Sequence, residues 1–193
     1  MFDFLPPVSA ERINGSPLTH VIAQVRFPSQ QLLATPAGVS QLHDTIASDY
    51  PRLLSEPQTI LTAGPAGTST TEVPQWRMTD LRAAWSVVVS PESLSIETSE
   101  YTSWSNMRQR LNDALVRLTD MTRLRVRERA GLRYVNQVPL NAQGNLEGLV
   151  RPSLLGLLID DGWRRNLDWS MSQTLVSDGN VKLHMRHGTG SLV

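Results

Sequence analysis

The 193-residue sequence contains no cysteine. Disulfide bonds, thiol catalysis and thiolate metal sites are therefore excluded, and we expect a cytoplasmic protein. The sequence also lacks a long apolar run, so we expect no membrane-spanning helix and no contact with a membrane. Its first residues lack the basic region and apolar stretch of a secretory signal, so we expect no cleaved leader.

Lysine is almost absent, because the basic residues are 17 arginines and Lys182. They are balanced by 18 acidic residues, so the formal net charge is zero. A dedicated nucleic-acid coat protein usually carries a global basic excess, which this chain does not have. Apolar residues make up 40% and charged residues 19% of the chain, which is typical of a soluble globular protein.

Periodicity and turn residues predict an N-terminal arm over residues 1–17, which holds three prolines, followed by one α+β domain over residues 18–193. Residues 55–73 and 139–150 are rich in turn-forming residues and are predicted to be loops. The predicted helices cover residues 38–50, Thr102–Met121 and Pro152–Ile159. The predicted strands are His20–Phe27, Gln75–Thr79, Ala83–Ser90, Ser93–Ser99, Arg123–Val138, Asn166–Val176 and Asn180–Arg186.

This order of elements predicts an antiparallel sheet with helices packed on one face. The string is β-α-β-β-β-α followed by β-α-β-β, so the second part repeats the beginning of the first. A duplicated helix-grip or TATA-binding-protein-like unit would give this order, with halves at residues 18–122 and 123–193. No sequence identity links the halves.

The segment that follows the predicted long helix is rich in arginine. Read as a strand, it places alternate side chains on one face. One interpretation is an anion-binding surface for a phosphate backbone or an acidic partner. The other is cross-strand pairing with Glu92, Glu97 and Glu100 of the preceding hairpin. The arginines on the shared face are Arg123, Arg125, Arg127, Arg129 and Arg133.

No pattern in the sequence predicts a catalytic, cofactor or metal site. The glycine-rich segment at residues 64–70 lacks the lysine of a phosphate-binding loop, and His184 and His187 should face opposite sides of a strand. Tyr134 and Asn136 share the apolar face of the arginine-rich strand, which indicates a buried hydrogen-bond cluster. Exposed tryptophan beside arginine is enriched at binding hot spots, so we consider Trp163, Arg164, Arg165 and Trp169 a candidate interface.

Three stretches carry a resemblance to a known family. They are SPLTHVIAQVRFP near the start, YTSW at the opening of the long helix, and RERAGLRYVNQV after it. In this order and spacing they resemble a sporadically distributed bacterial family of unknown function, over most of residues 16–140. Members usually continue through a further strand and a closing helix, so the resemblance implies that this chain is shortened at its C-terminus.

The resemblance implies a fold and no catalytic residues. The patchy distribution of the family is typical of mobile-element or anti-phage gene content. We therefore hypothesise a non-enzymatic protein-interaction module of a bacterial accessory system, which binds a protein partner or a second copy through an exposed sheet edge. The alternative hypothesis is a nucleic-acid or nucleotide binder that uses the arginine face.

Overall fold

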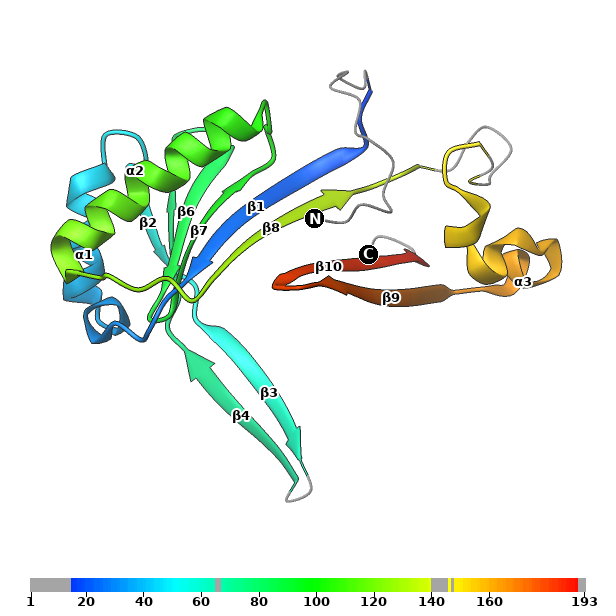
Figure 1. Ribbon diagram of the computed structural model, residues 1–193, viewed down its shortest axis with the longest axis horizontal. Helices are drawn as coiled ribbons and strands as arrows, with labels where there is room; N and C mark the ends of the chain where they lie inside the picture. Colours follow the sequence, from blue (N-terminus) through cyan, green and yellow to red (C-terminus); the bar gives the residue numbers. More distant parts are fainter. Residues whose placement is uncertain (1–14, 65–66, 140–145, 147, 191–193) are drawn as a thin grey trace. The chain divides into compact units, whose positions relative to one another are not determined.

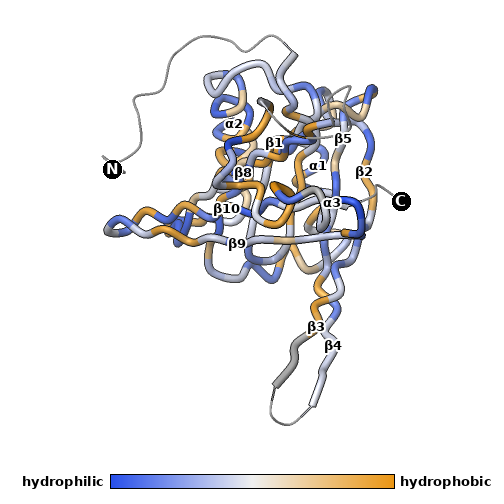
Figure 2. Tube along the Cα trace, turned by 90° about the vertical axis from the view of Figure 1, so that its right-hand side faces the viewer, coloured by the Kyte–Doolittle hydropathy of each residue, from blue (hydrophilic) through white to orange (hydrophobic). Residues whose placement is uncertain are grey.

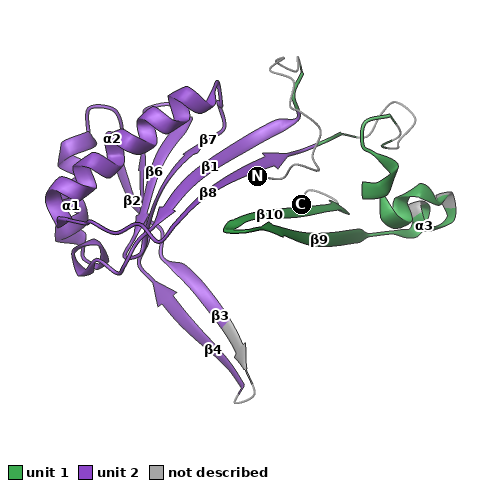
Figure 3. Cartoon of the chain, in the orientation of Figure 1, with its two compact units in different colours: residues 1–16, 138–193 green, residues 17–137 purple. Residues whose placement is uncertain are grey.

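The computed structural model describes residues 15–64, 67–139, 146 and 148–190. Within these residues it confirms the predicted α+β class, with ten strands whose pairs are all antiparallel. Most of the predicted arm and of the loop at 139–150 lies outside the described residues. The chain divides into two compact units, residues 17–137 and the remainder (Figure 3). The division falls at Val138, whereas we expected a single domain or halves that meet at residue 123.

The first unit contains one six-stranded sheet, ordered β2-β5-β6-β7-β1-β8, and a separate hairpin of β3 and β4. Helices α1 and α2 lie on one face of this sheet (Figure 1). The elements are β1 (Leu18–Arg26), α1 (Pro36–Ile46), β2 (Arg52–Ser55), β3 (Gln58–Gly64), β4 (Gly67–Val73), β5 (Trp76–Thr79), β6 (Trp85–Ser90), β7 (Ser93–Thr98), α2 (Trp104–Thr122) and β8 (Arg129–Asn136).

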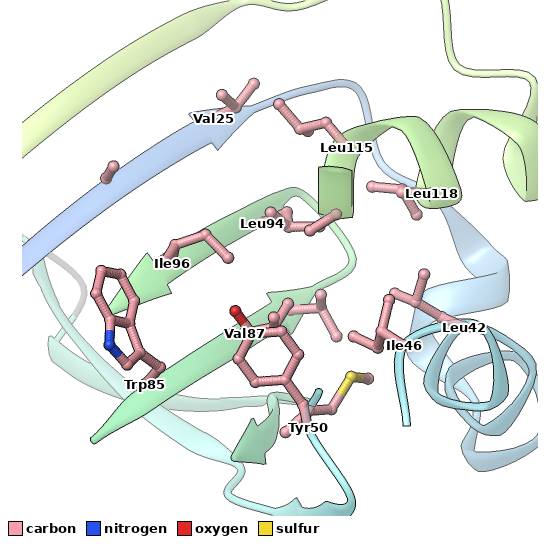
Figure 4. Close-up of a cluster of buried hydrophobic side chains, with 14 of the residues drawn as sticks. Val25, Leu42, Ile46, Tyr50, Trp85, Val87, Leu94, Ile96, Leu115 and Leu118 are labelled. Atoms are coloured by element: carbon pink, nitrogen blue, oxygen red, sulfur yellow. The ribbon is translucent and has the colours of Figure 1, made fainter. Parts of the chain in front are cut away.

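Alternation along the strands builds the core under the helices. In β1, Val21, Ala23 and Val25 are buried and stand in register with buried residues of β7. Residues of the two helices close the cluster from the other side, as the close-up in Figure 4 shows. Burial of each large aliphatic side chain contributes about 1.5–3 kcal/mol, so this face holds the unit together.

Helix α2 forms as its apolar stripe predicts, with Met107, Ala114 and Leu118 buried. Ser103 caps it, because its hydroxyl accepts a hydrogen bond from the amide of Asn106 at 3.2 Å. Trp104, the first residue of the helix, is 44% exposed.

The expectation of a loop over residues 55–73 is wrong. This segment contains the hairpin of β3 and β4, with Gln58 in register with Val73 and Gly64 with Gly67. Its threonines and Ile60 favour extended backbone, and their β-branched side chains outweigh the local glycines and prolines. The described side chains of this hairpin are exposed apart from partly buried Val73, so no hydrophobic alternation marked the strands in advance.

The second unit consists of short helical turns followed by a hairpin. Its elements are two 3₁₀ turns (Pro152–Leu154 and Gly156–Ile159), α3 (Asp161–Asn166), β9 (Trp169–Asp178) and β10 (Val181–Gly190). The expected helix over Pro152–Ile159 is replaced by the two turns, because Gly156 adopts a left-handed φ of 53° between them. Gly179, with a φ of 55°, makes the predicted tight turn of the hairpin. No described side chain of this unit from Val138 onward is fully buried.

No helix among the described residues is both long and apolar enough to cross a membrane.

Candidate interaction surface

Strand β8 is the outermost strand on one side of the six-stranded sheet. It pairs antiparallel with β1, and its other edge pairs with no other described strand. The register sets Arg133 opposite Ile22, Gly131 opposite Gln24 and Arg129 opposite Arg26. Each edge strand leaves half of its backbone N–H and C=O groups unpaired, so β8 offers a template for another strand.

The five arginines that were expected to share one face of a strand do not lie on one strand, because β8 begins at Arg129 and not at Arg123. We call these residues the ladder arginines; they are Arg123, Arg125, Arg127, Arg129 and Arg133. Arg123 ends helix α2 with a left-handed φ of 58°, so the backbone turns there and does not continue as a strand. Arg125 and Arg127 lie in the connector that returns the chain to the sheet. Only Arg129 and Arg133 project from the strand itself, on the face opposite the helices.

The structure also does not pair the ladder arginines with the hairpin glutamates. Glu92 pairs with Arg26 at 2.9 Å, Glu97 with Arg77 at 2.8 Å and Glu100 with Arg82 at 2.7 Å. All five ladder arginines are exposed and make no ion pair within the part of the chain that the structure describes. The prediction of a single strand that carries all five arginines is therefore wrong, and their positive charges have no ion-pair partner among the described residues.

A charged network crosses the same face of the sheet further inward. The Arg77 guanidinium donates to Glu56 and to Glu97, each at 2.8 Å, and the second bond spans β6. Ser95 donates to the Oε1 atom of Glu97 at 3.4 Å, and the Nε2 atom of His20 lies 3.7 Å from the Oε2 atom that accepts from Arg77. Burial alone would lower the pKa of Arg77, but the two carboxylate hydrogen bonds outweigh it and the pKa is raised. The groups of this network satisfy one another, which favours a structural role.

The opposite face of β8 is largely apolar and only partly covered. Ala130, Leu132 and Tyr134 stand in register with the buried residues of β1, yet Leu132 is 43% exposed and Tyr134 46% exposed. Helix α2 packs against β7 and β1, so β8 extends past its cover. This result contradicts the interpretation of Tyr134 and Asn136 as a buried cluster, because both side chains are exposed.

Tyr134 is held in place by a second aromatic ring. It meets Tyr101, just before α2, edge to face with ring centroids 5.8 Å apart. Burial of the Tyr134 hydroxyl, together with its hydrogen bond to Tyr101, raises its pKa to about 12. The contact fixes one side of the Tyr134 ring and leaves the other exposed.

Gly131 lies between the two arginines of β8. A side chain at this position would meet no atom within 4 Å, so glycine is not required here by close packing. The irregularity in the β1–β8 pairing lies between Leu18 and His20 instead. On the face that carries Arg129 and Arg133, the glycine therefore leaves an open space between the two guanidiniums.

The sequence did not reveal a cluster of contacts around Arg110, which belongs to helix α2. The Arg110 guanidinium lies 4.4 Å from the ring centroid of Trp85 and donates to the hydroxyl of Tyr50 at 3.2 Å and to Asn106 at 3.0 Å. Burial raises the pKa of Tyr50. The cluster borders an open depression of about 330 Å³ between α1 and α2. Its lining adds Asp49, Asp113 and Arg117 to the residues of this cluster.

The candidate interface in the second unit is exposed where the structure describes it. Trp163 on α3 is 58% exposed and Trp169 at the start of β9 is 68% exposed. Arg165 is exposed as well, while the side chain of Arg164 lies outside the description. The residues are not on one element, because the end of α3 separates the first three from Trp169.

Basic and apolar side chains share one face of the β9–β10 hairpin. By its register, one face presents Lys182, His184 and Arg186 beside a row of exposed apolar residues on β9. Arg186 donates to Gln173 across the hairpin at 3.2 Å, which agrees with this assignment of faces. Figure 2 shows hydrophobic and hydrophilic residues following one another along β9 and β10. The apolar residues of this face are Trp169, Met171 and Leu175.

Among the described residues, no group of three or more histidine, aspartate or glutamate side chains is arranged to hold a metal ion.

Comparison of the chain with protein-family models, with curated proteins and with solved structures found no match. The family resemblance of the three sequence stretches therefore stays a prediction.

Proposed function

We propose that this chain is a non-enzymatic protein-interaction module and that the free edge of β8 recognises its partner. One observation carries the proposal. An eight-residue edge strand presents on one face exposed arginines that have no ion-pair partner among the described residues, and on the other face partly exposed apolar side chains. A strand that only completes a sheet needs neither feature.

The other end of the sheet supports this interpretation by contrast. Strand β2 is an edge with only four residues, and short edges are one way in which proteins avoid unwanted pairing. Strand β8 has twice that length. Strand addition to an exposed edge is a recurring mode of peptide recognition, in which main-chain hydrogen bonds supply affinity and alternate side chains supply specificity.

Two features of the sequence support a cellular compartment and a type of genetic system for this interaction. The absence of cysteine supports a cytoplasmic protein. The resemblance to a sporadically distributed bacterial family supports a role in an accessory system, of the kind associated with mobile elements or phage defence. A partner encoded by a neighbouring gene is expected in such a system.

Selection of peptides from a random library on the purified full chain tests the proposal. We expect binders that protect the amides of residues 129–136 from hydrogen exchange. We also expect Leu132→Asp to abolish their binding, because it places a charge on the apolar side of the edge. The control is Leu81→Asp, which introduces the same charge at a leucine in the turn between β5 and β6 that is 70% exposed, against 43% for Leu132. Binders that protect other amides, or that lose affinity equally with both variants, would refute the assignment of this edge.

Polyanion binding is a second candidate function, because five exposed arginines make no ion pair among the described residues. Binding to a single-stranded oligonucleotide would then fall steeply as salt rises. The triple substitution of Arg125, Arg127 and Arg129 by alanine would abolish this binding and leave the fold intact. Unchanged binding by the triple variant, or no binding at low salt, would exclude this candidate.

A further inference from the structure

We propose that the edge of β8 selects a partner strand in which two acidic residues flank an apolar-x-apolar triplet. This inference rests on the proposed function and adds the chemistry of the partner. Side chains on one face of a strand are about 6.6–6.8 Å apart. A strand added to β8 therefore faces Arg129 and Arg133 with residues that are four positions apart.

The open face of β8 determines where the acidic residues belong. Arg129 and Arg133 are exposed and have no ion-pair partner within the described residues. Directly opposite positions of antiparallel strands bring side chains to about 4.5–5.5 Å, within reach of a carboxylate. The position opposite Gly131 is unrestricted, because an open space lies there. The partner face therefore reads acidic, any residue, acidic.

The helix-side face of β8 determines where the apolar residues belong. The positions opposite Ala130 and Leu132 lie between the two acidic positions, and the position opposite Tyr134 follows them. Apolar side chains there would cover Leu132 and Tyr134, which are about half exposed in the free chain. The combined pattern is acidic-apolar-x-apolar-acidic. It reads identically in both directions, so either strand orientation satisfies it.

A second copy of the chain does not fit this edge. The residues of β8 are RAGLRYVN, which include no carboxylate. Antiparallel pairing of β8 with itself keeps faces matched, so each arginine meets another arginine, the glycine or an uncharged residue. Like charges in opposite positions destabilise a strand pair. The edge is therefore suited to a different protein and unsuited to self-association.

A nucleic acid satisfies only one of the two faces. Phosphates would pair with Arg129 and Arg133, but the apolar row of Leu132 and Tyr134 projects to the other side of the strand. Single-stranded nucleic acids require aromatic stacking on the same surface as the basic groups, and the open face of β8 has no aromatic residue. The geometry therefore favours an acidic polypeptide.

Three synthetic peptides and the intact chain test the inference. The first has glutamates four positions apart with valines at the two flanked apolar positions and threonine elsewhere. The second replaces the glutamates by glutamine, and the third replaces them by lysine. We expect the glutamate peptide to bind roughly tenfold or more tightly than the glutamine peptide, since each exposed ion pair contributes up to about fivefold. We also expect its binding to protect the amides of residues 129–136 from hydrogen exchange.

A charge exchange supplies the decisive variant. Arg129→Glu with Arg133→Glu should reverse the preference, so that the lysine peptide binds tighter than the glutamate peptide. The matched control is Arg125→Glu with Arg127→Glu, which changes the net charge equally but leaves the strand untouched. We expect this control to keep the preference for glutamate. If both double variants reverse the preference, general electrostatics decides and the inference falls.

The remaining outcomes separate the inference from the proposed function. Equal binding of the glutamate and glutamine peptides, with protection of β8, overturns the acidic pattern and leaves strand addition intact. Protection of those β8 amides that do not bond to β1 before any peptide is added, whether or not it depends on protein concentration, shows that the edge is already occupied and overturns both. Preferential binding of an oligonucleotide that the glutamate peptide cannot displace overturns both as well.

Discussion

Replacement of Leu132 by alanine tests whether β8 is uncovered in the folded chain. Full burial of a leucine side chain contributes about 1.5–3 kcal/mol. Leu132 is 43% exposed, so slightly more than half of that area is buried and its truncation should lower the free energy of unfolding by about 1–1.5 kcal/mol. Leu118 of helix α2 is completely buried. Its replacement by alanine should cost about 2–5 kcal/mol, because it adds a cavity to the lost transfer energy.

Equilibrium unfolding in urea, followed by tryptophan fluorescence, measures both variants. Trp85 is a suitable reporter because it is buried beside Arg110. The slope of the free energy against urea should be the same in both variants, so that the midpoints compare stability directly. A loss for Leu132→Ala as large as that for Leu118→Ala would mean that β8 is covered in solution, and the edge could not serve as a binding site.

Three further perturbations test the parts of the first unit that hold this edge. Arg110→Met should cost about 2–4 kcal/mol in urea unfolding and shift the emission of Trp85, because it removes the cation–π contact and leaves a buried hydroxyl without its donor; a change below about 0.5 kcal/mol would contradict this role. Glu97→Gln should cost about 1–2 kcal/mol, because the half-buried guanidinium of Arg77 loses one of its two carboxylates, and an unchanged midpoint would show that the network contributes nothing. The stability of the chain should also fall as pH rises from about 10 to about 12: the unfolded state releases the Tyr134 proton at the ordinary pKa of tyrosine, while the folded state retains it up to about 12. Tyr134→Phe should make this fall shallower, and an identical pH profile for the variant would refute the assignment.

Local sequence signals predicted the elements whose formation depends on neighbouring residues. Periodicity predicted a helix over Thr102–Met121, where α2 lies, and strands over Ala83–Ser90 and Ser93–Ser99, which the structure pairs as β6 and β7. The alternation in β1 predicted which of its side chains are buried. In each case the information lies within a few residues along the chain, so periodicity and turn chemistry are sufficient.

The candidate interaction surface on β8 depends on contacts between residues that are distant in sequence. Alternation showed that Arg129 and Arg133 share a face, but it could not show that β8 pairs with β1 and with no other described strand, since strand order is set by the whole sheet. The end of α2 at Arg123 was missed because the cap uses an arginine in the left-handed region where glycine is usual. The suggested pairing of the hairpin glutamates with the ladder arginines was wrong because Glu97 pairs with Arg77 across β6, while Glu92 and Glu100 pair with Arg26 and Arg82 at the ends of strands.

The two faces of β8 distinguish recognition from simple protection of an edge. Charged side chains are a common protection against edge-to-edge aggregation, so Arg129 and Arg133 alone would fit a purely defensive role. A defensive edge gains nothing from exposed apolar groups on its other face, since these promote the association that the charges oppose. Leu132 and Tyr134 are nonetheless exposed there, and Tyr101 holds the tyrosine ring in place. We therefore propose that the arginines disfavour strands that lack acidic residues, and that the apolar row adds affinity for a strand that carries them.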